Sequence, residues 1–118
     1  MPKRVLIVDD HQSFRGLARR LVEEIGFDVV GEASSGAQAL LEERRLRPDL
    51  VLLDIQLPDL DGFTVASSLS SLPAAPTVVL VSTREASDYG PRVRLCGALG
   101  FISKAELSSA SLAAMLRR

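Results

Sequence analysis

Carboxylates stand at two places in the sequence where a short apolar run ends. Asp9 and Asp10 follow the run at 5–8, and Asp54 follows the run at 50–53. If these side chains share one edge of a sheet, two charges about 5 Å apart repel each other by about 3 kcal/mol at an effective dielectric of about 20. An aspartate after a strand often caps the next helix, which accounts for one of the three carboxylates but not for all of them. The spacing therefore predicts a site rather than a packing feature.

The chemistry that this cluster favours is binding of a hard cation together with a phosphate. Oxygen ligands suit Mg²⁺, which proteins hold through one or two carboxylates, with waters and phosphate oxygens completing the shell. Lys104 follows the apolar segment at 100–103 and offers a compact positive charge for a phosphate. Ser82 directly ends the run at 78–81 and offers a hydroxyl, although the neighbouring Thr83 competes for that role.

The segments that must position these residues alternate between two kinds. Short runs rich in valine, leucine and isoleucine predict strands, and amphipathic or small-residue stretches between them predict helices. The expected strands are 5–8, 29–33, 50–53, 78–81 and 100–103, and the expected helices are 14–25, 36–46, 62–72, part of 86–96, and 108–116. This order predicts an α/β fold with a parallel sheet covered by helices on both faces. Ligands of such sheets lie beyond the carboxyl ends of the strands, where all the candidate residues stand.

Length and composition exclude several classes of protein. The chain has 118 residues, which fits one domain, and 47% of them are hydrophobic, which excludes a largely disordered chain. No apolar run approaches the ~20 residues needed to span a membrane, and the start is too short for a signal-peptide core, so we expect a cytoplasmic protein. The formal net charge is −1, so the chain lacks the excess of basic residues that nucleic-acid-binding domains use to contact phosphates.

Other titratable residues are interpreted more plainly. His11 is the only histidine and Cys96 the only cysteine, which excludes a zinc site built from several such ligands. His11 is expected at the surface or at a helix cap. The paired glutamates at 23–24 and 42–43 are interpreted as solvated helix faces.

Four segments, taken in order, resemble the receiver domain of two-component response regulators over nearly the whole chain. They are 5–11 (VLIVDDH), 48–62 (PDLVLLDIQLPDLDG), 78–82 (VVLVS) and 97–104 (GALGFISK). The stretch 10–15 (DHQSFR) further resembles the NarL/LuxR-type subgroup. The resemblance implies a flavodoxin-like, doubly wound (βα)5 fold whose five parallel strands have the order 2-1-3-4-5.

The resemblance also implies a role for each candidate residue. Asp54 would accept a phosphoryl group from a phosphohistidine on a sensor histidine kinase. Asp10, Asp54 and the backbone carbonyl of Gln56 would bind Mg²⁺, and Asp9 would position a metal-bound water. The phosphoryl oxygens would be held by Lys104 and the Ser82 hydroxyl, and Phe101 would be an aromatic switch that turns inward when Ser82 moves.

The implied partners follow from the same family. Residues 1–118 would form the receiver domain, a phosphoacceptor that assists only its own phosphorylation and dephosphorylation rather than an enzyme. A homodimer on phosphorylation is one expected outcome, with Arg92 and Arg94 as exposed candidates for the responding surface. The domain would bind neither nucleic acid nor membrane, and transcriptional control would come from a helix-turn-helix domain absent from these residues.

Three departures from the family pattern stand near the site. Ala105 replaces the usual proline after the lysine, Thr83 replaces a small residue, and Gly90-Pro91 interrupts the fourth helix, which we expect to be short. A cis bond before alanine costs about 2.5–4 kcal/mol, so the placement of Lys104 depends on this position.

Three other functions compete with this interpretation, and the sequence disfavours each of them. A phosphohydrolase of the haloacid-dehalogenase type needs a second aspartate where Gln56 stands. A flavin or nucleotide module needs a glycine-rich loop where Asp9-Asp10 stand. A degenerate receiver that only binds partners is disfavoured because every acidic and basic site position is present, and a phosphorylation assay separates it from an active receiver.

Overall fold

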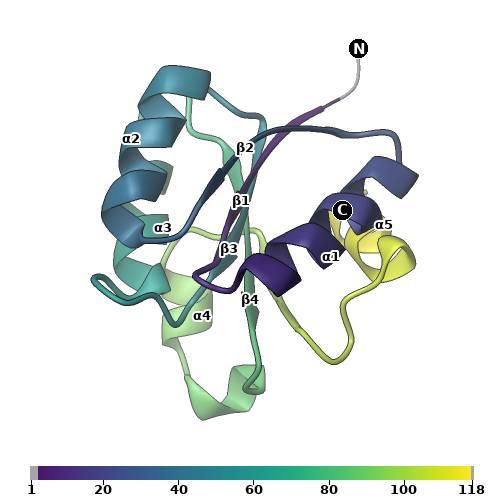
Figure 1. Ribbon diagram of the computed structural model, residues 1–118. Coiled ribbons are helices and arrows are strands. Elements are labelled where there is room, and N and C mark those ends of the chain that lie inside the picture. Colours follow the sequence, from purple (N-terminus) through teal and green to yellow (C-terminus); the bar gives the residue numbers. More distant parts are fainter. Residues whose placement is uncertain (1–2, 118) are drawn as a thin grey trace.

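The computed structural model describes residues 3–117, and within them the chain forms a five-stranded parallel sheet with the order β2-β1-β3-β4-β5 (Figure 1). This confirms the expected fold and strand order. The strands are β1 (Arg4–Val8), β2 (Asp28–Ala33), β3 (Leu50–Asp54), β4 (Thr77–Ser82) and β5 (Gly100–Ser103). The three inner strands are almost wholly buried, as their unbroken apolar runs predict.

The helices fall close to the expected ranges. They are α1 (Gln12–Glu24), α2 (Gly36–Leu46), α3 (Gly62–Ser70), α4 (Arg92–Leu95) and α5 (Ser109–Leu116), with a single 3₁₀ turn at Ala86–Asp88. Side chains cap three of them, because Ser35, Asp61 and Ser108 each accept a hydrogen bond from a backbone N–H three residues later. No helix within 3–117 is long and apolar enough to cross a bilayer.

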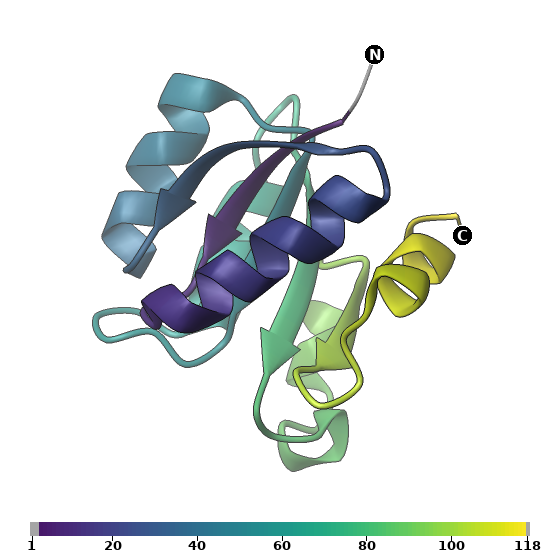
Figure 2. The ribbon, with the colours of Figure 1, turned by 45° about the vertical axis from the view of Figure 1, so that its right-hand side comes forward.

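Two helical layers cover the sheet. One apolar core joins the sheet to α2, α3 and α4, and the other joins it to α1 and α5. Figure 2 shows α1 crossing in front of the strands, with α5 on the right and α2 on the far left. Alternate residues of β1 enter alternate cores: Val5 and Ile7 face α1 and α5, whereas Leu6 and Val8 face the other layer.

The fourth helix is short, as the sequence predicts. It has four residues, Arg92–Leu95, and follows the 3₁₀ turn and Gly90, whose φ is 65°. Pro91 has no N–H to donate and stands at the N-cap of α4. The β4–α4 segment is therefore mostly irregular chain.

The interpretation of Glu43 as a solvated residue is wrong. Glu43 is 1% exposed, because it lies on the same face of α2 as the buried Gly36 and Ala39. Its Oε1 has no hydrogen-bond partner among the described residues. Its neighbour Glu42 pairs instead with Arg45, at 2.7 Å.

The turn between β3 and α3 is tightly fixed. Gly62 donates its N–H to the carbonyl of Ile55 at 2.7 Å, and a Cβ at position 62 would lie 2.5 Å from the Ile55 Cα, so only glycine fits. From the same turn, the Asp59 carboxylate accepts the N–H groups of Gly36 and Ala37 at 2.7 and 2.9 Å. The turn is thus bound to the start of α2 as well as to α3.

Candidate phosphoacceptor site

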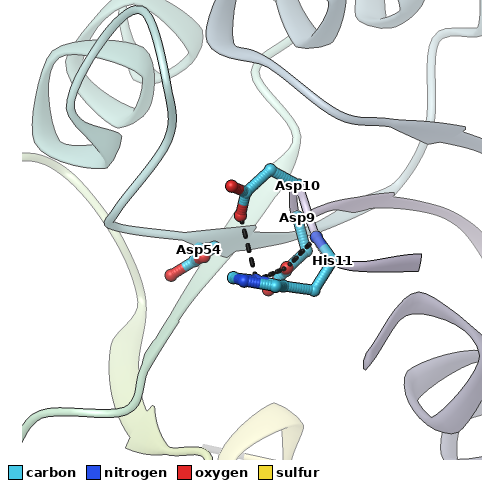
Figure 3. Close-up of side chains that lie close together, drawn as sticks. All are labelled: Asp9, Asp10, His11 and Asp54. Carbon is cyan, nitrogen blue, oxygen red and sulfur yellow. Dashed lines mark hydrogen bonds and ion pairs between the residues drawn. The ribbon is translucent and has the colours of Figure 1, made fainter. Parts of the chain in front are cut away.

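Two carboxylates are buried side by side where β1 and β3 end. Val8 and Leu53 are register partners, so the next residues, Asp9 and Asp54, are neighbours across the two strands. They are 0% and 2% exposed, and strand alternation places both on the α1 and α5 side of the sheet. The sequence prediction that these aspartates meet at one sheet edge is confirmed (Figure 3).

Lys104 supplies the positive charge for both carboxylates. Its Nζ lies 2.6 Å from Asp9 Oδ2 and 3.6 Å from Asp54 Oδ2, and its side chain is 14% exposed. The ammonium also lies 4.1 Å above the centre of the Phe14 ring, a cation–π contact made by α1. No peptide bond within 3–117 is cis, so Lys104 reaches the site across a trans bond to Ala105.

The pKa of Asp54 is raised to about 6. Burial is the main cause, because a carboxylate removed from water loses its hydration. The negative charge of Asp9 raises the pKa further, whereas Lys104 and the Gln56 N–H, 3.2 Å from Asp54 Oδ1, lower it. Asp54 is therefore protonated well below neutral pH and is mostly ionised above it.

Asp10 and His11 extend the cluster toward solvent. His11 Nδ1 lies 3.2 Å from Asp9 Oδ1 and 3.1 Å from Asp10 Oδ1, and both contacts are among the dashed lines in Figure 3. His11 also donates its backbone N–H to Asp9 Oδ1 at 2.8 Å. The ring is 68% exposed, as expected for a residue at a helix start, but its contacts with both aspartates were not predicted.

The donor set fits a hard divalent cation. Ligand atoms of Asp9, Asp10, His11 and Asp54 all lie within 4.8 Å of one another. Three of the four residues offer carboxylate oxygens, which Mg²⁺ prefers over imidazole nitrogen. Gln56 stands two residues after Asp54, at the start of the turn that Asp59 and Gly62 fix. The cluster is typical of a Mg²⁺ site.

Ser82 and Phe101 lie on the other side of the sheet end. Ser82 is fully buried, and its Oγ shares a hydrogen bond of 2.7 Å with the Tyr89 hydroxyl and accepts the Arg84 N–H at 3.1 Å. Phe101 is half-buried and packs with the α2, α3 and α4 core, where its ring is 6.1 Å from that of Tyr89. In the structure the Ser82 hydroxyl is therefore hydrogen-bonded to Tyr89 and Arg84 and not to Asp9 or Asp54.

Tyr89 is the residue at this site that the sequence analysis missed. It stands seven residues after Ser82 in a polar, irregular segment without the periodicity that marks core positions. One signal was available, since Tyr89 is the only tyrosine in a chain without tryptophan. Thr83, the other candidate hydroxyl, is exposed and lies 3.5 Å from the Gln56 side-chain oxygen.

Comparison with known proteins agrees with this geometry. Residues 5–117 match the family model of the response regulator receiver domain. A Pseudomonas aeruginosa protein named "Putative transcriptional regulator" is 45% identical over 112 residues, which cover 94% of this chain and 54% of that protein. The chain spans about half the length of the curated relatives it matches.

Solved structures of receivers superpose closely. The receiver domain of the "putative response regulator NarL" of Mycobacterium tuberculosis is 34% identical, with a TM-score of 0.84 over 99% of this chain and 98% of that one. A CheY of Borrelia burgdorferi, solved as a CheX-CheY-BeF3-Mg²⁺ complex, is 26% identical with a TM-score of 0.87 over 98% of this chain and 87% of that one.

Proposed function

The chain belongs to the response regulator receiver domain family, and from that premise we propose that it receives a phosphoryl group on Asp54 from a sensor histidine kinase. The family consists of phosphoacceptor signalling domains rather than classical enzymes. Its members similar to this chain include transcriptional regulators of the LuxR and NarL type. The single observation that carries the proposal is the buried Asp54 carboxylate between Asp9 and Lys104.

The proposed transfer is a substitution at phosphorus. An Asp54 carboxylate oxygen forms a bond to phosphorus while the P–N bond of the donor phosphohistidine breaks, and the leaving imidazole nitrogen keeps the electron pair. Hydrolysis later replaces the Asp54–phosphorus bond with a bond to water oxygen, which restores the carboxylate and releases phosphate. Positioning and charge neutralisation supply most of the catalysis in such transfers.

Asp9, Asp10, Asp54 and the Gln56 backbone carbonyl would hold Mg²⁺, which when bound supplies positive charge to the phosphoryl oxygens. The Lys104 ammonium, already 3.6 Å from Asp54, would contact a phosphoryl oxygen and would keep its ion pair with Asp9. Ser82 would donate its hydroxyl proton to another phosphoryl oxygen. Phe101 would move with Ser82 and carry the change to the surface of β5.

The wider role follows from the relatives. Because they are about twice as long as this chain, we propose that the receiver acts in the cytoplasm within a regulator whose helix-turn-helix DNA-binding part lies outside these 118 residues. Phosphorylation would then favour a homodimer through the surface of α4 and β5. This surface includes the exposed Arg94, whereas Arg92 is partly engaged, with its guanidinium 3.4 Å from Asp61 Oδ2.

The test is phosphorylation by a small phosphodonor with Mg²⁺, followed by intact mass measurement. The parent protein should gain one phosphate, and Asp54→Asn should gain none. Asp28→Asn, which removes an exposed aspartate at the start of β2, is the matched control and should be labelled like the parent. Equal labelling of Asp54→Asn contradicts the proposed acceptor, and no labelling of the parent favours a receiver that only binds partners.

A further inference from the structure

We propose that Tyr89 is a positioning residue for the Ser82 hydroxyl, and that it holds this hydroxyl on the α4 side of the sheet until a phosphoryl group is bound. The inference rests on the proposed function, because it takes Ser82 as the hydroxyl that contacts the phosphoryl group. Tyr89 itself touches neither Asp54 nor the charged cluster in the contacts described above.

The alternation of side chains along β4 explains why Ser82 needs a partner on that side. Leu80 packs into the core of α2, α3 and α4, so Ser82, two residues later, points the same way. Val81, the register partner of Asp54, faces α1 and α5 instead. Ser82 is 0% exposed, and a buried hydroxyl must find its hydrogen bonds inside the protein.

Hydrogen-bond counting sets up a competition between two partners of Ser82. A serine hydroxyl has one proton to donate and can accept two hydrogen bonds. At present it accepts the Arg84 N–H at 3.1 Å and bonds to the Tyr89 hydroxyl at 2.7 Å. Phosphoryl oxygens only accept, so Ser82 must give them its single proton and turn toward Asp54. Either hydroxyl can be the donor in the bond to Tyr89. If Ser82 donates, the bond must break or reverse, and if Tyr89 donates, turning the Ser82 Oγ toward Asp54 lengthens it.

The ring of Tyr89 connects this hydrogen bond to two elements, α3 and β5. It packs against Phe63 of α3 with centroids 5.3 Å apart and a T-shaped angle of 68°, and against Phe101 of β5 with centroids 6.1 Å apart. The guanidinium of Arg92, on α4, lies 4.4 Å from the centre of the same Phe63 ring. We therefore expect a change in the Tyr89 hydroxyl bond to reach Phe101 directly, and Arg92 of α4 through Phe63.

The free energy of the Ser82–Tyr89 hydrogen bond is small enough for ligand binding to break it. Net contributions of single neutral hydrogen bonds correspond to about a fivefold change in an equilibrium constant. A ligand shifts the equilibrium between two states only by the difference in its affinity for them. One new hydrogen bond to the phosphoryl group is large enough to compensate for the loss of the Ser82–Tyr89 bond. Removing the phenol hydroxyl should therefore favour the phosphoryl-bound arrangement without unfolding the ring stack.

Tyr89→Phe tests this directly, because it deletes the hydroxyl and keeps the ring. Beryllofluoride with Mg²⁺ is the phosphoryl mimic, and its affinity is measured by ¹⁹F NMR for the parent, Tyr89→Phe, Ser82→Ala and the double variant. Tyr89→Phe should bind about fivefold more tightly than the parent, and the gain should vanish in the Ser82→Ala background. Thr77→Val, at the exposed opposite end of β4, removes a hydroxyl remote from the site and should leave the affinity unchanged.

A second measurement uses the unmodified chain. Tyr89 is the only tyrosine and there is no tryptophan, so ultraviolet emission reports on Tyr89 alone. Beryllofluoride should change this emission in the parent and not in Asp54→Asn. Three results would overturn the inference and leave the proposed function intact. They are unchanged emission at saturation, an unchanged beryllofluoride affinity of Tyr89→Phe, and an equal gain in affinity from Tyr89→Phe in the Ser82→Ala background. No binding by the parent overturns the proposed function and this inference together.

Discussion

The two sides of the sheet end hold their functional side chains by different forces. On the α1 and α5 side, Asp9 and Asp54 are buried carboxylates, and the Lys104 ammonium lies within 3.6 Å of both. On the α4 side, Ser82 and Tyr89 are neutral and meet through a single hydroxyl–hydroxyl bond between aromatic rings. One side is an ion cluster with unbalanced negative charge, and the other is a hydrogen bond that can be exchanged.

Magnitudes explain why a receiver would need both. Removing one partner of a buried ion pair costs about 3–5 kcal/mol, whereas a neutral hydrogen bond contributes about 0.5–1.5 kcal/mol. A ligand cannot rearrange the first without losing its own binding site. It can rearrange the second with the free energy of one new contact, so we infer that the charged side binds and the neutral side responds.

Lys104→Met should have the largest effect on stability. It leaves Asp9 and Asp54 buried without their cation, and we expect a loss of about 3–5 kcal/mol in the free energy of unfolding at pH 8 without metal. The loss should be smaller at pH 5, where Asp54 takes up a proton instead. Urea unfolding at both pH values measures it, and Lys3→Met, which removes the other, exposed lysine, should cost little. Equal losses at the two pH values would contradict the ion cluster.

Asp54→Asn should remove most of the pH dependence of metal-free stability near pH 5. The pKa of Asp54 is raised to about 6 in the folded chain, above the ~3.9 of an unfolded aspartate. The folded state therefore binds more protons between these values, and stability declines as the pH rises through this window, by about 3 kcal/mol at most. Thermal or urea unfolding from pH 4 to 8 measures the slope. Asp28→Asn should keep it, and a slope that survives Asp54→Asn would assign it elsewhere.

Asp10→Asn should remove the stabilisation by Mg²⁺. The metal should raise the free energy of unfolding of the parent by about 2.7 kcal/mol at a hundredfold excess over its Kd. Without metal, Asp10→Asn should melt slightly above the parent, because it relieves repulsion from Asp9 and Asp54. Melting curves with Mg²⁺ and with a chelator measure both effects, and an Asp10→Asn protein that still gains stability from Mg²⁺ would falsify the ligand set.

Arg92→Ala tests the exposed surface of α4, next to the Tyr89 ring stack, and should have the smallest effect. Arg92 lies 3.4 Å from Asp61 Oδ2 and 4.4 Å over the Phe63 ring, but its side chain is 57% exposed. Exposed ion pairs and cation–π contacts each contribute less than about 1 kcal/mol. Urea unfolding should show a loss below about 1 kcal/mol, with Arg94→Ala as the exposed neighbour on the same helix. A loss as large as that of Lys104→Met would erase the difference between the two sides.

The charged side could be predicted from the sequence because its residues directly follow strands. The parallel order of apolar runs places every strand end at one edge, and Asp9, Asp54 and Lys104 then meet whatever the details of the loops. Even the missing proline after Lys104 did not matter, since the trans bond to Ala105 still lets the ammonium reach Asp9.

The neutral side could not be predicted to the same depth. Tyr89 reaches Ser82 from an irregular segment where no periodicity fixes which way a side chain points. The sequence correctly indicates a short helix after Gly90-Pro91, but not that the chain before it folds back onto β4. The prediction for Glu43 was wrong for a related reason. Adjacent glutamates look alike in sequence, but α2 directs Glu42 toward solvent and Glu43 toward the core.

The bond from Asp59 to the start of α2 has a consequence for exchanging parts between receivers. The Ala37 and Gly36 N–H groups lower the pKa of Asp59, and a Cβ at position 36 would lie 2.8 Å from Leu60 Cβ. The turn at 55–62 and the helix start at 35–37 are therefore one unit, although β3 and most of α2 separate them in sequence. A chimaera that transplants the turn alone would carry the Asp59 carboxylate without the matching start of α2 that donates to it, so both segments must be grafted together.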